Sequence, residues 1–286
     1  LCSGIAYDLE LIAACPPDGD LSAEFSGYAA DLAQSGLRVA SIMVCPSVDR
    51  QSTPPGSDWP ACPALTDIHA AARATFPTHI IGGGMVSFFP ELNRKPPPVH
   101  MLDFVSHGLN PIIHAADDIS VMETLEAVPH ILASARAMIG GAEYRLGPST
   151  IAMRHNPYGS RTIPNPRRER ICMAEDDPRQ DGDFAAVWLL GLAANVARAN
   201  VAVWTPAELY GPRGLIRDDG STRPVASMVA ALSRRAGQPV RAATVSAGSA
   251  QIDFDGVSII ANLTPDTTDD LPPFGWQSRL GSSTSS

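Results

Sequence analysis

Short aliphatic runs alternate with longer amphipathic stretches along the first 235 residues of the chain. The runs are rich in β-branched and aliphatic residues and predict strands at residues 9–14, 38–45, 79–83, 102–106, 145–152 and 201–205. The stretches carry apolar residues at helical spacing and predict helices at about 21–34, 65–76, 120–139, 184–199 and 224–235. Such alternation is typical of a parallel sheet covered by helices.

The six strand-helix units favour a (β/α)8 TIM-type barrel that lacks its first two units. The loops after the predicted strands are longer and more polar than the loops before them, as in barrels whose site lies at the C-terminal strand ends. The chain opens without Met and directly before a strand-like run, which fits a start inside a barrel. The alternative is an open doubly wound sheet. That fold usually has a Gly-rich phosphate loop after its first strand, and none follows residues 9–14.

The pattern changes after residue 235. Residues 240–246 and 251–262 alternate apolar and polar positions, and Asp255-Gly256 predicts a hairpin turn. From residue 266 onward Asp, Pro, Gly and Ser predominate. We therefore predict a barrel domain over 1–237, the start of a β-rich C-terminal domain over 238–265, and a disordered tail over 266–286.

Charge and cysteine usage narrow the partners and the compartment. The 286 residues carry a net charge of -9 with only 18% charged residues, whereas phosphate backbones and anionic lipids need clustered Lys and Arg. We expect neither nucleic acid nor a membrane as a partner, and no apolar run approaches the roughly 18 residues of a membrane span. The 5 cysteines are scattered without a CxxC pair, which favours a reducing, cytoplasmic compartment.

Polar residues that can bind or catalyse follow four of the predicted strands. Because a TIM-type barrel builds its site from the loops at the C-terminal strand ends, we expect these side chains to converge at one end of the sheet. The candidate catalytic residues are Glu91, His114, Asp117, Arg154 and Glu208, and the candidate substrate-binding residues are Asn93, Asn110, Asn156 and Tyr210.

Three of the candidates have a structural alternative. Glu91 suits acid/base chemistry or a solvated loop ion pair with Arg94. Glu208 suits the same chemistry or an ion pair with Arg213 at the rim. Arg154 suits an oxyanion or a substrate group, and equally a bridge between carboxylates across the barrel mouth.

His114 and Asp117 are three residues apart, a spacing that suits a metal or an acid/base dyad. The alternative is a network at a helix N-terminus, because Asp117 directly precedes the S-x-x-E capping box of Ser120 and Glu123. We expect no cofactor and no metal, and a divalent ion only if these two residues hold one.

Several segments, in order, resemble the D-apionate lactonase family. They are GGGMVSFFPELNR, NPIIHAADD followed by SVMETLE, RLGPSTIAMRHNP, DDPRQ and AELYGPRG, and the resemblance covers about residues 5–262. It implies the central TIM-barrel domain and the beginning of the C-terminal β domain, in a family whose members have an additional N-terminal region. The implied activity is hydrolysis of D-apionolactone to D-apionate in bacterial catabolism of the branched sugar apiose.

The leading hypothesis is therefore a sugar lactonase with a small sugar lactone as its substrate. Glu91, Asp117 or Glu208 would activate water, and Arg154 or His114 would stabilise the oxyanion. Asn93 and Asn156 would hold the hydroxyls.

One alternative is a retaining glycoside hydrolase with Glu91 and Glu208 about 5 Å apart. Another is a carbohydrate-binding barrel remnant. We expect an open sheet edge beside residues 9–14, and Glu208 and Arg154 to matter more to turnover than Glu91.

Overall fold

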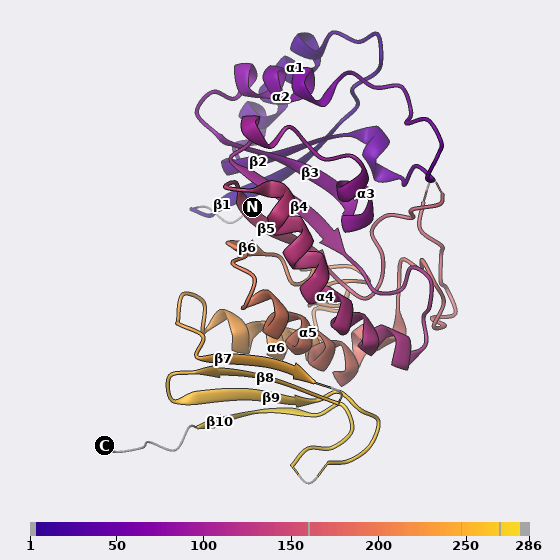
Figure 1. Cartoon of the computed structure of the whole chain (residues 1–286), viewed down its shortest axis with the longest axis vertical. Coiled ribbons are helices and arrows are strands. Elements are labelled where there is room, and N and C mark those ends of the chain that lie inside the picture. Colours follow the sequence, from indigo (N-terminus) through magenta and orange to yellow (C-terminus); the bar gives the residue numbers. More distant parts are fainter. Residues whose placement is uncertain (1–3, 160, 247, 269, 281–286) are drawn as a thin grey trace.

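Six parallel strands form the main sheet in their order along the chain (Figure 1). The computed structural model describes residues 4–159, 161–246, 248–268 and 270–280. The strands are β1 (Ala6–Ala13), β2 (Arg38–Pro46), β3 (Ile80–Phe88), β4 (Phe104–Leu109), β5 (Glu143–Ser149) and β6 (Val203–Trp204). The six predicted strands are confirmed. A doubly wound sheet reverses its strand order at a switch point, so this sequential order excludes that alternative.

Helices follow the strands as the alternation predicts. They are α1 (Leu21–Ser35), α2 (Leu65–Thr75), α3 (Phe89–Arg94), α4 (Asp118–Ile139), α5 (Asp183–Val196) and α6 (Pro224–Ser233), with short 3-10 turns η1 (Ser47–Arg50), η2 (Val99–Met101) and η3 (Pro178–Asp181). Asp20 caps α1 by accepting a hydrogen bond from the Ala23 amide, and Gly36 ends this helix with a φ of 65°. In the described part of the chain no helix has the length and apolar character needed to cross a membrane.

Helix α3 corrects one expectation, because the sequence placed Glu91 in a polar loop. Pro90 occupies the first turn of this helix, where its missing amide hydrogen costs nothing. Glu91 lies in the first turn and Arg94 in the last, an arrangement that complements the helix dipole. The polar composition of this segment thus supports a short helix.

The sheet curls strongly, so that side chains from distant strands meet inside it. An oxygen of Asp8 on β1 lies 3.3 Å from a guanidinium nitrogen of Arg145 on β5. Arg145 also donates to the Ser41 hydroxyl of β2 at 2.7 Å. Since β1 and β5 are four places apart in the sheet, only a barrel-like curvature brings them together.

The six described strands do not close into a ring. Within the described residues β1 pairs with β2 alone and β6 with β5 alone. The predicted open edge beside residues 9–14 is therefore present. The curled parallel sheet with its outer helices is a TIM-type barrel domain, as the sequence predicted.

Two apolar cores hold the helices on the sheet. The larger lies under α4 and α5 and includes Tyr144 of β5, Leu125 of α4 and Trp188 of α5, each at most 2% exposed. The smaller lies under α1 and α2 and includes Phe25 and Ile68. Nearly every residue of α5 is buried, because this helix packs against α4 and α6 and against three strands of a second sheet.

The second sheet is antiparallel and packs against α5 (Figure 1). Its strands are β7 (Ala242–Ser246), β8 (Ser249–Phe254), β9 (Val257–Asn262) and β10 (Trp276–Leu280), in the order β10-β9-β8-β7. The predicted turn at Asp255-Gly256 joins β8 to β9, with Gly256 at a φ of 73°. The alternating pattern therefore identified this β unit correctly.

The prediction of a disordered tail over 266–286 is wrong for its central part. Residues 276–280 form β10, paired along their whole length with β9. Phe274 packs against Phe184 with ring centroids 5.0 Å apart, and Leu271 is 8% exposed. A few apolar anchors among polar residues are enough to order this segment. Residues 281–286 lie outside the described residues.

Candidate functional site

Arg154 lies between two carboxylates at the mouth of the curled sheet. One guanidinium nitrogen donates to Glu10 Oε1 at 2.7 Å, and another reaches Glu10 Oε2 at 3.4 Å. Its Nε lies 3.8 Å from Glu208 Oε1. Arg154 follows β5, Glu10 belongs to β1 and Glu208 follows β6, so three parts of the barrel contribute to this contact.

Arg213 completes the charged cluster and fixes the loop after β6. Its Nε donates to Glu208 Oε1 at 3.0 Å. It also donates to the carbonyl oxygens of Met153 at 3.2 Å and Glu175 at 3.0 Å. We call Glu10, Arg154, Glu208 and Arg213 the mouth cluster. The ion pair expected between Glu208 and Arg213 is present, and Glu208 also lies beside Arg154.

A cavity of about 220 Å³ adjoins the mouth cluster inside the sheet. Glu10 and Arg154 line it, together with Asp8, Ser106 and Arg145. Drug-sized ligands usually occupy roughly 300–1,000 Å³. The size and the charged lining therefore suit a small polar ligand.

His155 is a neutral imidazole next to the mouth cluster. Burial, and then the positive charges of Arg154, Arg50 and Arg213, lower its pKa to about 4. Its Nε2 atom is buried without a hydrogen-bond partner among the described residues. At neutral pH this residue thus adds no charge to the mouth.

Glu91 does not join the mouth cluster. Its side chain is only 5% exposed, and its Oε1 accepts hydrogen bonds from Arg94 at 2.6 Å and from the Ser52 hydroxyl at 2.5 Å. The expected ion pair with Arg94 is present. The expectation that this pair is solvated is wrong, because α3 packs the carboxylate against the loop after β2.

His114 and Asp117 contact different residues, and neither set of contacts includes Arg154. Asp117 is exposed and caps α4, where its Oδ1 accepts from the Ser120 amide at 2.9 Å. The hydrogen bonds from Ser120 lower the pKa of Asp117. The ring of His114 lies beside Tyr158, with Nε2 3.4 Å from its hydroxyl. Across the ranges that the structure describes, no three His, Cys, Asp or Glu side chains gather as a possible metal site.

The predicted substrate-binding residues mostly serve the loops that carry them. The buried Asn110 amide donates to the carbonyl oxygens of Thr150 at 2.6 Å and Ala152 at 2.9 Å. Asn156 accepts from the Tyr158 amide at 2.8 Å and donates to a nearby carbonyl. Asn93 is exposed, and Tyr210 is 63% exposed. The side-chain amides of Asn110 and Asn156 thus both form hydrogen bonds with the backbone.

Sequence reasoning missed Glu10, the main partner of Arg154. A signal was present, since Asp8 and Glu10 are two residues apart in a strand and thus point to the same face. It also missed His155, which directly follows Arg154. The prediction of strands in these segments rested on the aliphatic residues around Glu10 and His155.

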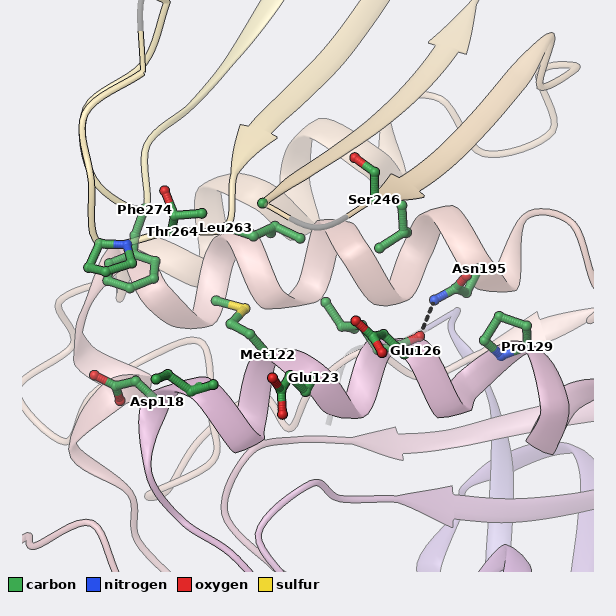
Figure 2. A pocket seen from close by; sticks show the side chains of 15 residues that line it. Asp118, Met122, Glu123, Glu126, Pro129, Asn195, Ser246, Leu263, Thr264 and Phe274 are labelled. Atoms are coloured by element: carbon green, nitrogen blue, oxygen red, sulfur yellow. Dashed lines mark hydrogen bonds between the residues drawn. The ribbon is translucent and has the colours of Figure 1, made fainter.

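A larger cavity of about 770 Å³ lies elsewhere, between α4, α5 and the second sheet (Figure 2). Met122, Leu263 and Phe274 contribute apolar side chains to its lining, and Glu123 and Glu126 belong to its α4 side. Asn195 on α5 donates to the Leu125 carbonyl at 3.0 Å across its end. No member of the mouth cluster lines this groove, so the barrel mouth remains the candidate site.

Residues 2–237 match the family model described as D-apionate lactonase, TIM barrel domain. Over 231 residues the chain is 49% identical to a D-apionate lactonase of Brucella anthropi. That alignment covers 79% of this chain and 38% of the relative, so the chain spans well under half of the length of this relative.

A solved structure shows the same fold at low sequence identity. A calcium-binding mutant of Bacteroides uniformis beta-glucuronidase 2 superposes with a TM-score of 0.54 and 9% identity, covering 96% of this chain and 34% of that chain. An active-site mutant of Rhizomucor miehei beta-1,3-glucanosyltransferase, solved with laminaritriose, gives a TM-score of 0.48 and 14% identity. The match covers 78% of this chain and 76% of that chain. At 9% identity the likeness to the beta-glucuronidase concerns architecture alone.

Proposed function

Because the chain belongs to the D-apionate lactonase TIM barrel family, we propose that it carries the site of a sugar lactonase that hydrolyses D-apionolactone to D-apionate. The observation that carries this proposal is the family match over residues 2–237, supported by the 49% identical relative. We extend the proposal to a role in bacterial apiose catabolism in the cytoplasm.

Lactone hydrolysis needs three chemical functions, which the mouth cluster can supply with two side chains. A base must activate water, a donor must hold the tetrahedral oxyanion, and an acid must protonate the departing ring oxygen. Arg154 is our choice for the oxyanion, because its planar guanidinium offers several fixed donors and it lines the cavity. Glu10 grips this guanidinium through both carboxylate oxygens and thereby orients it.

Glu208 is our choice for the proton transfers. Among the described residues its Oε1 accepts from Arg213, while its Oε2 accepts no hydrogen bond and stays available. The water oxygen bonds to the lactone carbonyl carbon as Glu208 takes the water proton, and the negative charge develops on the carbonyl oxygen beside Arg154. When the ring C–O bond then breaks, Glu208 returns the proton to the ring oxygen. The new carboxylic acid loses its proton to solvent.

The glycoside hydrolase alternative receives no support from the placement of the carboxylates. A retaining mechanism needs two carboxyl groups about 5 Å apart across the substrate. Glu91 contacts Ser52 and Arg94, whereas Glu208 contacts Arg154 and Arg213, and the two sets share no residue. We therefore keep the lactonase alone.

Acid release from D-apionolactone tests the proposed function. We expect the purified protein to release protons well above the spontaneous rate, and Glu208→Gln to be slower by about 100-fold to 10,000-fold. Glu123→Gln on α4 is the matched control, because Glu123 is exposed and forms no ion pair within the described part of the chain. Absence of turnover by the wild-type protein, or turnover unaffected by Glu208→Gln, would contradict the proposal. Parallel assays on aryl glycosides should show no release of the aryl group.

A further inference from the structure

A continuous set of contacts joins Glu91 to the segment that carries Arg154. Glu91 Oε1 accepts from the Ser52 hydroxyl at 2.5 Å, and Arg94 donates to both groups at 2.6 Å. The Ser52 amide in turn donates to the Pro157 carbonyl at 3.0 Å. Glu91 thus reaches the loop after β5 through Ser52.

The bond between Ser52 and Pro157 crosses the mouth of the sheet. Ser52 follows β2 and Pro157 follows β5, while β3 and β4 lie between these two strands. Neighbouring strands in a sheet are held by their ladder, but loops this far apart need contacts of their own. This contact ties the 154–157 segment, which begins with Arg154, to the loop after β2.

The burial of Glu91 shows that its position is specified by these contacts. A buried carboxylate such as that of Glu91, whose side chain is 5% exposed, is costly unless charged and polar partners surround it. Arg94 supplies the opposite charge from one helical turn away, and Ser52 supplies a hydroxyl from another loop. Both donors converge on the same oxygen, which holds the Ser52 loop against α3.

We propose that Glu91 is a positioning residue, which acts through Ser52 to hold the 154–157 segment and with it Arg154 in the geometry for lactone hydrolysis. This inference rests on the proposed function of the mouth cluster. It assigns Glu91 no contact with the substrate, since Glu91 does not line the cavity and touches no member of that cluster.

Substitutions at both ends of the Glu91–Ser52 contact separate positioning from catalysis. Glu91→Gln keeps an acceptor for Ser52, so we expect its kcat to stay within about threefold of wild type, whereas a lost catalytic base typically costs at least about 100-fold. Glu91→Ala and Ser52→Ala break the contact and should each lower kcat on the order of tenfold, with KM changed by less than about twofold, because small displacements of catalytic groups slow the chemical step.

The double variant tests whether the two residues act through one contact. Ser52→Ala combined with Glu91→Ala should be no slower than Glu91→Ala alone, since coupled residues are not additive. Ser52→Thr retains the hydroxyl, so its kcat should be close to that of the wild type and above that of Ser52→Ala. Ser47→Ala is the matched control, because Ser47 lies in the same loop but donates to the Ala14 carbonyl instead.

Hydrogen exchange provides a readout that does not depend on activity. The Ser52 amide is protected by the Pro157 carbonyl and should exchange faster, by roughly tenfold, in Glu91→Ala while the central strands remain protected. If the wild-type protein has no lactonase activity, the proposed function fails while this measurement still tests the contact. Unchanged exchange, additive losses in the double variant, or a Glu91→Gln variant that is inactive beside a fully active Ser52→Ala would each overturn the inference.

Discussion

Replacing Arg154 by alanine tests the centre of the proposed mechanism. The substitution removes the guanidinium that lies 2.7 Å from Glu10 and 3.8 Å from Glu208. It removes the proposed oxyanion donor and leaves two carboxylates at the mouth without the cation between them. We therefore expect a large loss of turnover together with a modest loss of stability.

The size of each loss follows from the surroundings of Arg154. Its side chain is 22% exposed and those of Glu10 and Glu208 are each 24% exposed, so water screens the ion pairs in part. Charged hydrogen bonds in such settings contribute roughly 1.5–3 kcal/mol, which sets the upper limit of the destabilisation. Loss of an oxyanion donor costs about 100-fold to 1,000-fold in kcat. Arg154→Lys keeps the charge without the planar fork and should fall between wild type and Arg154→Ala.

The assay follows proton release from D-apionolactone in a weakly buffered indicator solution, with thermal unfolding of each variant measured in parallel. Arg241→Ala is the control, because it removes an Arg ion pair with Asp255 from the second sheet, where both side chains are more than 60% exposed. We expect this control to retain full activity. A folded Arg154→Ala protein that keeps more than about a tenth of wild-type turnover would refute the oxyanion role, since the loss would lie far below the usual cost.

Three further predictions concern groups outside the mouth cluster. Burial lowers the pKa of His107 from 6.5 to about 4, so between these values the unfolded chain binds the additional proton and the free energy of unfolding falls as the pH falls, by up to ~3 kcal/mol in all. Urea unfolding at pH 7 and pH 5 should show about 2 kcal/mol of this loss, and His107→Gln should reduce it. Asp117→Ala should lower the melting temperature slightly, as loss of a helix cap does, with unchanged kcat in the proton-release assay; a large fall in kcat would restore Asp117 as a catalytic candidate. Lys95→Met leaves Asp49, whose side chain is 1% exposed, without the ammonium group 2.6 Å away, and should lower the free energy of unfolding in denaturant by about 3–5 kcal/mol. A loss below about 1 kcal/mol would mean that water reaches Asp49.

The central strands of the barrel sheet could be predicted from the sequence because they are buried on both faces. Residues of β2 from Ser41 onward and nearly all of β3 and β4 are buried, which gives continuous apolar runs that need no knowledge of partners. The sequential alternation of strands and helices then favoured a barrel. The curl of the sheet could not be predicted in the same way, because it depends on contacts such as that of Asp8 with Arg145, 137 positions later.

The proximity of Arg154 and Glu208 could be predicted because each lies just after a strand, at the same end of the sheet. Glu91 and Asp117 satisfied the same rule and lie elsewhere, since the rule places a residue near a strand end but does not determine its contacts. The local signals were more informative for Asp117, whose S-x-x-E context indicated the cap that the structure contains. For Glu91 the decisive partner is Ser52, 39 residues earlier, and no local pattern identifies it.

The mouth cluster combines one anchored carboxylate with charges carried by loops. Glu10 lies within β1 and is held in register opposite Met43 of β2, so its position is set by the sheet. Arg154, Glu208 and Arg213 come from loops that are tied to one another by the contacts of Arg213 with the Met153 and Glu175 carbonyls. Because loops tolerate substitution better than buried strands do, we expect substitutions that change the substrate specificity to lie in these loops. Glu10 should tolerate least, since it sets the orientation of Arg154 on which the proposed chemistry depends.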